Sequence, residues 1–174
     1  MYRHILAPAL LVLLCSPGAS AHEIVRHANP NFPIASSVGV PAGADLVFLR
    51  GMLADVADDK APAGSIDRLG DTATQARSVL GKVEKELQTV GLTMADVVKM
   101  NVYVVGDPRK GGTMDFEGLM QAYMAVYGLR AQENKLPART TVQVAGLPVP
   151  GALVEIEVVA AKHADHDHAK QATP

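Results

Sequence analysis

Residues 136–161, near the end of the chain, place a guanidinium, a hydroxyl and two carboxylates in two runs that alternate like β-strands. In the first run Arg139 and Thr141 fall on one face, because successive side chains of a strand point to opposite sides. In the second run Glu155 and Glu157 alternate with apolar residues. A Gly/Pro cluster between the runs predicts a hairpin. Pairing that joins the apolar faces would gather the four polar side chains on the other face, in a register that the sequence leaves open.

On an arbitrary hairpin, a face of this kind is more often a set of solvent-exposed ion pairs than a site. Here the surrounding motif resembles that of the Rid/YjgF family, the reactive-intermediate deaminases. The resemblance rests on Pro-Ala-Arg-Thr at 137–140, Leu-Pro at 147–148 and Val-Glu-Ile-Glu at 154–157. It implies that Arg139 binds a substrate carboxylate and that Glu155 positions the attacking water. It also implies that Gly51, which ends an earlier strand, offers its backbone N–H to the same carboxylate.

The reaction of the family is hydrolysis of 2-enamines or 2-imines to 2-keto acids and ammonia, with 2-iminobutanoate and 2-iminopropanoate as typical substrates. Arg139 suits the carboxylate, because its planar fork takes two oxygens at once and keeps its charge. Binding there would fix the position of the imine carbon. Glu155 could hold the water or move its proton. The resemblance implies no metal ion and no organic cofactor.

Two positions depart from the family pattern. Thr141 stands where many members have cysteine, although its hydroxyl can still donate a hydrogen bond. Ser36 is the nearest match to a tyrosine that often lines the cleft, which indicates a wider pocket and a different substrate. Two other functions therefore stay open: a small-carboxylate-binding protein without turnover, and a structural or chaperone-like trimer.

The rest of the chain supplies the elements that must position these residues. Strands are expected at 23–26, 37–40, 45–51 and 97–105. A first helix is expected from a capping box of Thr72 and Gln75 to Gly91, and a second at 114–127, ended by Gly128. Residues of the second helix predicted to face inward are Phe116, Leu119, Met120, Tyr123, Met124 and Tyr127. This Met and Tyr stripe is typical of core rather than of a cofactor site.

The order β-β-β-α-β-α-β-β predicts an α/β two-layer sandwich, in which a mixed sheet carries two helices on one face. Apolar residues of the last two strands expected beneath the helices are Val142, Val144, Val154, Ile156 and Val158. The opposite face, with Arg139 and Glu155, would then be open. The resemblance implies a chorismate-mutase-like fold and a homotrimer, whose sheets form a central barrel and whose sites lie between subunits.

Residues 1–21 have the features of a cleavable signal peptide. Arg3 precedes an apolar run at 5–15, and Ala-Ser-Ala at 19–21 suits a signal peptidase. The apolar run is too short to span a bilayer, so we expect export to the periplasm or medium, with no membrane association after cleavage. Cys15, the single cysteine, would leave with the peptide, and the bulky residue before it disfavours a lipoprotein.

Residues 22–161 are expected to form one domain, because 174 residues suffice for one core and hardly for two. The net charge of −2 favours neither nucleic acid nor an anionic membrane as a partner. Residues 162–174 contain alternating His and Asp and are expected to be a disordered tail rather than a Zn, Cu or Ni site. His22 at a new N-terminus could chelate Cu(II), an idea that nothing else in the sequence supports.

Overall fold

The computed structural model describes residues 23–162. The predicted signal peptide, His22 and the residues from 163 onward lie outside this range. Lys162, which the sequence analysis assigned to the tail, is the last residue of a strand. The elements are β1 (Val25–Ala28), β2 (Ala35–Gly39), β3 (Asp45–Leu53), α1 (Ile66–Leu69), α2 (Thr72–Thr89), β4 (Val97–Val105), α3 (Phe116–Gln132), β5 (Ala138–Val144) and β6 (Val154–Lys162), with 3-10 turns at Met94–Asp96 and Pro108–Lys110.

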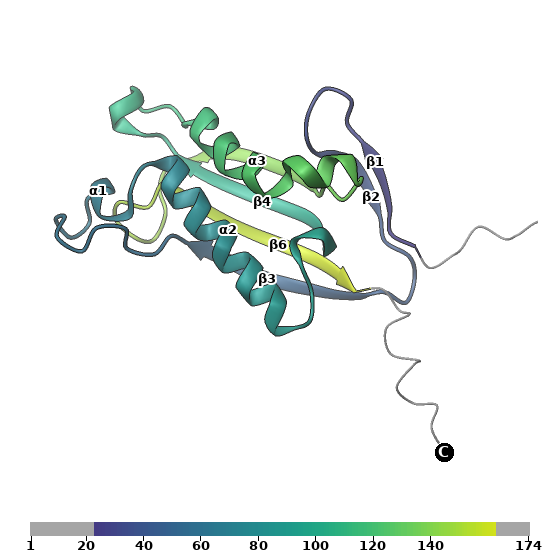
Figure 1. Ribbon diagram of the computed structural model, residues 1–174. Helices are drawn as coiled ribbons and strands as arrows, with labels where there is room; N and C mark the ends of the chain where they lie inside the picture. The colour runs from purple at the N-terminus through teal and green to yellow at the C-terminus, as the bar shows by residue number, and fades with distance from the viewer. Residues whose placement is uncertain (1–22, 163–174) are drawn as a thin grey trace, which may run out of the picture.

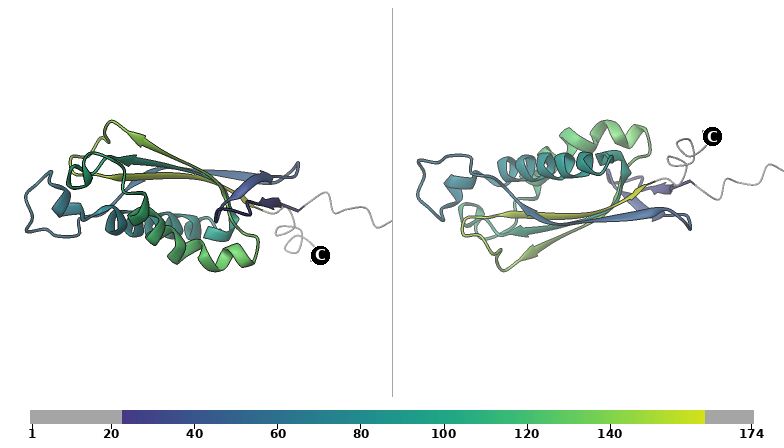
Figure 2. Two further views of the ribbon diagram at one scale, coloured as in Figure 1. Left: turned by 90° about the horizontal axis from the view of Figure 1, so that it is seen from above. Right: turned by 90° about the horizontal axis from the view of Figure 1, so that it is seen from below.

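The six strands form one mixed sheet in the order β1-β2-β5-β4-β6-β3. β5 runs parallel to β4, whereas β6 pairs with β4 in the antiparallel sense on its other side. α2 and α3 lie side by side across one face (Figure 1), and Figure 2 shows that the other face of the sheet carries no helix. The predicted two-layer α/β sandwich is therefore confirmed. We call the face without helices the open face.

α2 follows the predicted apolar stripe but begins differently. Its N-cap is Asp71, whose carboxylate accepts a hydrogen bond from the backbone N–H of Thr74 at 2.8 Å. This bond lowers the pKa of Asp71, as expected for a carboxylate at a helix start. The predicted capping box is wrong, because the side chains of Thr72 and Gln75 are both buried. Gly91 follows the helix with a φ of 75°, which suits the glycine predicted there.

Gln75 instead ties α2 to the connection before β6. Its amide nitrogen donates to the carbonyl oxygens of Gly70 at 2.9 Å and Gly151 at 3.0 Å. Its amide oxygen accepts from the backbone N–H of Leu153 at 2.7 Å. The side chain is completely buried, so these three bonds fix where β6 starts relative to the helix layer.

α3 is longer than predicted, because Gly128 does not end it and the helix continues to Gln132. The left-handed residue is Asn134, with a φ of 52°, and the N–H of Lys135 bonds back to the carbonyl of Arg130 at 2.9 Å. A glycine inside a helix lowers the stability of the helix by about 1 kcal/mol relative to alanine. Burial of the adjacent Tyr127 is large enough to offset this loss. Met124, predicted to face inward, is exposed.

β5 and β6 do not form the predicted hairpin, because β4 lies between them. The connection at 145–153 passes the end of β4, where the N–H of Val105 donates to the carbonyl of Leu153 at 2.9 Å. β5 is also nearly an edge strand. Its only pairing with β2 joins Ala35 to Ala138, so residues 139–144 pair with β4 alone among the described strands.

The register with β4 decides which face each side chain of β5 takes. Arg139 pairs with Met100 and Thr141 with Val102, both of which are buried beneath the helices. Arg139 and Thr141 therefore lie on the helix face. The valines of β5, at 142 and 144, lie on the open face, so the prediction that the helices cover them is wrong.

The apolar residues of β6 behave as predicted. Val154, Ile156 and Val158 are buried on the helix face. Glu155 and Glu157 consequently lie on the open face, opposite to Arg139. The prediction that the arginine and the two glutamates share a face is wrong, because β5 and β6 point their apolar sets to opposite sides of the sheet.

We predict that Gln75→Met lowers the free energy of unfolding by about 3 kcal/mol, because three backbone groups lose their buried partner. Gln88→Met is the matched control, since Gln88 is exposed on the same helix, and it should change the free energy by less than about 0.5 kcal/mol. Urea unfolding followed by circular dichroism at one protein concentration measures both. Equal stability of the two variants would contradict the assignment.

Candidate functional site

Arg139 lies between the start of β5, helix α3 and the β1–β2 turn. Its guanidinium carbon is 4.2 Å from the ring centre of Tyr123 and 6.0 Å from those of Phe32 and Phe116. Both terminal nitrogens lie against the sulfur of Met120, at 3.3 and 3.4 Å. We call Phe32, Phe116, Met120 and Tyr123 the Arg139 clamp. Stacking on aromatic faces is favourable for a guanidinium, but it supplies no acceptor for its N–H groups.

The partners of Arg139 differ from those of every other arginine in residues 23–162. Arg26, which is also half-buried, donates to the carbonyl oxygens of Ala95, Val97 and Leu136 at 2.9–3.1 Å. The arginines at 50, 68, 77, 109 and 130 each donate to at least one oxygen. Arg139 donates only to a thioether, which is a weak acceptor. Within this part of the chain it has no carboxylate partner.

Burial has an electrostatic consequence at this position. Desolvation lowers the pKa of Arg139, and the only counteracting influence is Tyr123. The group nevertheless stays charged at neutral pH, because an arginine side chain loses its proton only in strong base. A half-buried cation without an oxygen acceptor favours an anion from outside the chain.

Thr141 lies two residues further along the same face of β5. Its hydroxyl oxygen is buried and has no hydrogen-bond partner, one of two such side-chain atoms found in residues 23–162. Buried polar groups are normally paired, so an unpaired hydroxyl on the same strand face as a guanidinium without an oxygen acceptor suits a polar group of a ligand. The next polar residue on this face, Gln143, is already used, because its amide bonds the backbone of Gly112 and Met114 at 3.0 and 2.9 Å.

Gly51 and Glu155 form a second pair of predicted site residues. Gly51 lies in a β-bulge of β3, where the register with β6 shifts between Leu49 and Met52. A Cβ added to Gly51 would overlap the carboxylate of Glu155, so a larger residue here would force the Glu155 side chain to move. Gly51 does not end the strand as predicted, because β3 continues to Leu53, but the structure brings Gly51 and Glu155 into contact.

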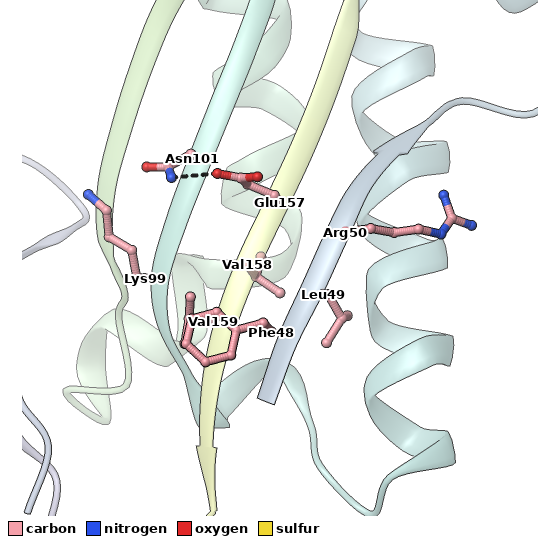
Figure 3. Close-up of a pocket in the computed structure, with 8 residues that line it drawn as sticks. All are labelled: Phe48, Leu49, Arg50, Lys99, Asn101, Glu157, Val158 and Val159. Carbon is pink, nitrogen blue, oxygen red and sulfur yellow. Dashed lines mark hydrogen bonds between the residues drawn. The ribbon is translucent and has the colours of Figure 1, made fainter. Parts of the chain in front are cut away.

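Glu157 lies next to Glu155 on the open face. Its Oε1 accepts from the amide of Asn101 at 2.8 Å and from the hydroxyl of Tyr103 at 3.1 Å. The bond to Glu157 raises the pKa of Tyr103. Asn101, Glu157 and Phe48 line a hollow of about 480 Å³, in which the Asn101–Glu157 bond is visible (Figure 3). Arg50, at its rim, points away from the glutamate (Figure 3).

The predicted site is therefore divided into two half-sites within one chain. Arg139 and Thr141 form one half on the helix face, and Gly51 and Glu155 form the other on the open face. Besides the thickness of the sheet, β4 separates the two, which adds roughly 9–10 Å of strand spacing. Ser36 is exposed on β2, one residue after the Ala35 that pairs with β5.

Several residues of both half-sites were not predicted as functional. The sequence analysis assigned Phe116, Met120 and Tyr123 to the core, because helical spacing does not indicate that Arg139 packs against them. Phe32 precedes the turn proline and carried no signal. Asn101 and Tyr103 could have been found, because they are the polar positions that alternate with the buried residues of β4.

Residues 23–162 contain neither a membrane-spanning helix nor a cluster of potential metal ligands. None of the described helices is long and apolar enough to cross a membrane. The described histidines, aspartates and glutamates form no group of three that could hold a metal ion.

Comparison with known proteins places the chain among relatives of one fold. The family model described as Endoribonuclease L-PSP matches residues 45–162, more than half of the chain. A RutC family protein of Pyrococcus horikoshii is 32% identical over 141 residues, which cover 80% of this chain and 98% of the relative.

Solved structures agree on the fold. YyfB of Yersinia pestis, from the Rid protein family, aligns with a TM-score of 0.58 at 23% identity, covering 82% of this chain and 99% of its own. NMB1025 of Neisseria meningitidis, from the YjgF family, aligns with a TM-score of 0.50 at 22% identity, covering 82% and 98%. At these identities the likeness concerns the fold alone.

Tyr123 provides a test of the Arg139 clamp through pH. Burial raises its pKa from 10.0 to about 12, although the charge of Arg139 lowers it in part. A pKa that is higher in the folded state means that the phenol proton stabilises the fold below pH 10, and that this stabilisation is lost as the pH rises through about 12.

We predict that Tyr123→Phe lowers the free energy of unfolding at pH 7 by about 1 kcal/mol, because the 2.9 Å bond from the hydroxyl to the carbonyl of Pro33 is lost. Between pH 10 and 12 the variant should lose stability less steeply than the wild type. Denaturation at a series of pH values measures the two slopes. The same dependence of stability on pH in the wild type and the variant would contradict the raised pKa of Tyr123.

Proposed function

Because the chain belongs to the endoribonuclease L-PSP family, which includes the YjgF, RutC and Rid proteins, we propose that it hydrolyses 2-imino and 2-enamine acids. The products are 2-keto acids and ammonia. The observation that carries this proposal is the half-buried guanidinium of Arg139, which has no oxygen acceptor among residues 23–162 and suits the carboxylate of such a substrate.

Arg139 and Thr141 would bind the acid end of the substrate. The carboxylate would displace the weak thioether acceptor of Met120 and take a charge-assisted bond from the guanidinium. The unpaired hydroxyl of Thr141 would donate to a second oxygen. Together these contacts would hold the imine carbon in one place, which is the main contribution of proximity to the rate.

Glu155 would activate the attacking water by proton transfer. It would take one proton from the water as the oxygen adds to C2 and pass it to the imine nitrogen, which gives a carbinolamine. It would then take the hydroxyl proton and pass it to the amine, so that C2 becomes the ketone, the C–N bond breaks and ammonia leaves. An enamine would first take a proton at C3 to become the imine. Gly51, whose missing side chain leaves room for the carboxylate of Glu155, would donate its backbone N–H to the substrate.

The division of the site supports assembly from two subunits. One chain holds the Arg139 half-site and the Glu155 half-site on opposite faces of the sheet, so they cannot meet around one small molecule. A neighbouring copy that places its open face against the edge of β5 would bring them together. This arrangement agrees with the homotrimer that the resemblance implies, with sites between subunits.

The separation also favours one alternative function. A protein that kept Arg139 and Thr141 but did not place Glu155 opposite them would bind carboxylates without turnover. RNA cleavage, which the family description names, is less favoured by the charges, because the chain has a net charge of −2 and a polyanion requires a basic surface. Export to the periplasm, proposed from residues 1–21, would place either activity outside the cytoplasm.

We predict that Arg139→Ala and Glu155→Ala each abolish ammonia release from an imine generated in situ by an amino acid oxidase. Trimers that contain both variants should regain activity. Whatever their composition, each mixed trimer has one complete site in three, so about one third of the wild-type rate is expected.

Differently tagged subunits allow such mixed trimers to be purified, and the two single-variant trimers are the controls. Mixed trimers without activity would contradict a site shared between subunits. Keto acid binding that is lost in Arg139→Ala, together with no turnover by the wild type, would select the binding protein instead.

We predict that Phe48→Asp weakens the trimer. Phe48 is 73% exposed on the open face, and covering a phenylalanine is worth about 1.5–3 kcal/mol, so the dissociation constant should rise at least about tenfold. Leu129→Asp is the control, because Leu129 is 77% exposed on α3, on the helix side. Light scattering over a dilution series measures both, and equal masses at every dilution would contradict a covered open face.

A further inference from the structure

We propose that the acid bound by Arg139 carries a large apolar side chain, and that Phe32, with Phe116 and Met120, forms the wall that selects it. This inference rests on the proposed role of Arg139 as the carboxylate anchor. It adds a specificity-determining residue, Phe32, that lies outside the residues matched by the family model.

The two phenylalanine rings lie within reach of a substrate bound to Arg139. In a bidentate pair the carboxyl carbon lies about 4 Å from the guanidinium carbon, so the substituent on C2 starts at about 6 Å. The ring centres of Phe32 and Phe116 are 6.0 Å from the same carbon, so a substituent directed toward their side of the guanidinium would pack against the rings. The two rings are also 6.1 Å apart and tilted by 36°, so they form one continuous apolar surface.

The chemistry of this surface favours an apolar substituent. The guanidinium contacts three aromatic rings and a thioether, and none of these groups is a strong hydrogen-bond partner. A polar substrate side chain would lose its water there without compensation. A methyl group would leave the exposed part of Phe32, which is 39% exposed, largely in contact with solvent. A branched or aromatic side chain would cover it.

The turn that carries Phe32 is held in place before any ligand binds. Phe32 lies in the β1–β2 turn. The N–H of Ile34 donates to the carbonyl of Phe32 at 2.7 Å, and the N–H of Asn29 donates to the carbonyl of Ile34 at 3.1 Å. The ring of Tyr123 lies against the guanidinium of Arg139, and its hydroxyl donates to the carbonyl of Pro33 in the same turn at 2.9 Å. Met120 is the adaptable member, because an unbranched thioether can move aside and pack on the substrate.

Equilibrium binding of 2-keto acids tests the wall without requiring turnover, because the product keeps both the carboxylate and the side chain. The ligands are pyruvate, 4-methyl-2-oxopentanoate and phenylpyruvate, titrated into the assembled full-length protein by calorimetry. For the wild type we expect affinity at least about tenfold higher for the two larger acids than for pyruvate.

Phe32→Ala should lower the affinity for the larger acids by about fivefold to tenfold and leave that for pyruvate within about twofold. Phe32→Leu, which keeps an apolar side chain, should recover part of the loss. Leu129→Ala, an exposed apolar position elsewhere on α3, should change none of the affinities. Circular dichroism verifies that each variant is folded.

The outcomes separate this inference from the proposed reaction. A wild type that prefers pyruvate or binds no keto acid would refute the proposed apolar wall. An equal loss of affinity for all three acids in Phe32→Ala would refute it as well. Graded, Phe32-dependent binding without imine turnover would support the wall and refute the deaminase. Turnover without any preference for size would refute the wall and leave the deaminase standing.

Discussion

The charge of Arg139 is the constraint on which the rest of the site depends. Its guanidinium is taken partly out of water, lies on the ring of Tyr123 and donates only to the sulfur of Met120 among residues 23–162. Arg26 shows how the same chain satisfies a buried guanidinium when its role is structural, through three backbone carbonyls. A cation left without such oxygens costs stability, and the proposed anion would offset that cost.

Tyr123 links this cation to the architecture around it. Its ring lies under the guanidinium, and its hydroxyl fixes the turn that presents Phe32. α3 therefore does more than cover the sheet, because the same helix face supplies Phe116, Met120 and Tyr123. Packing of the core and the proposed binding would use one set of side chains here, so a stripe typical of core can also surround a candidate site.

The central position of β4 explains why one chain holds the site in two halves. β5 and β6 flank it on opposite sides and turn their apolar sets to opposite faces. Arg139 and Thr141 then point toward α3, while Gly51 and Glu155 lie on the open face. The valines of β5 and Phe48 give that open face an apolar character of its own, as expected for a surface that another subunit covers.

Local pattern determined much of this protein by itself: the alternation of β4 and β6, the stripe of α2 and the order of elements that fixes a two-layer α/β sandwich. These features follow from periods of 2 and 3.6 and from turn residues, which act over a few positions. Tertiary structure alone decided that β4 separates β5 from β6, and hence that Arg139 and Glu155 face opposite sides. Strand order and pairing depend on contacts between distant segments, and a one-residue change of register reverses the face of every side chain. The candidate site residues could be named from the sequence, whereas their separation on two faces of the sheet, and the aromatic rings around Arg139, could not.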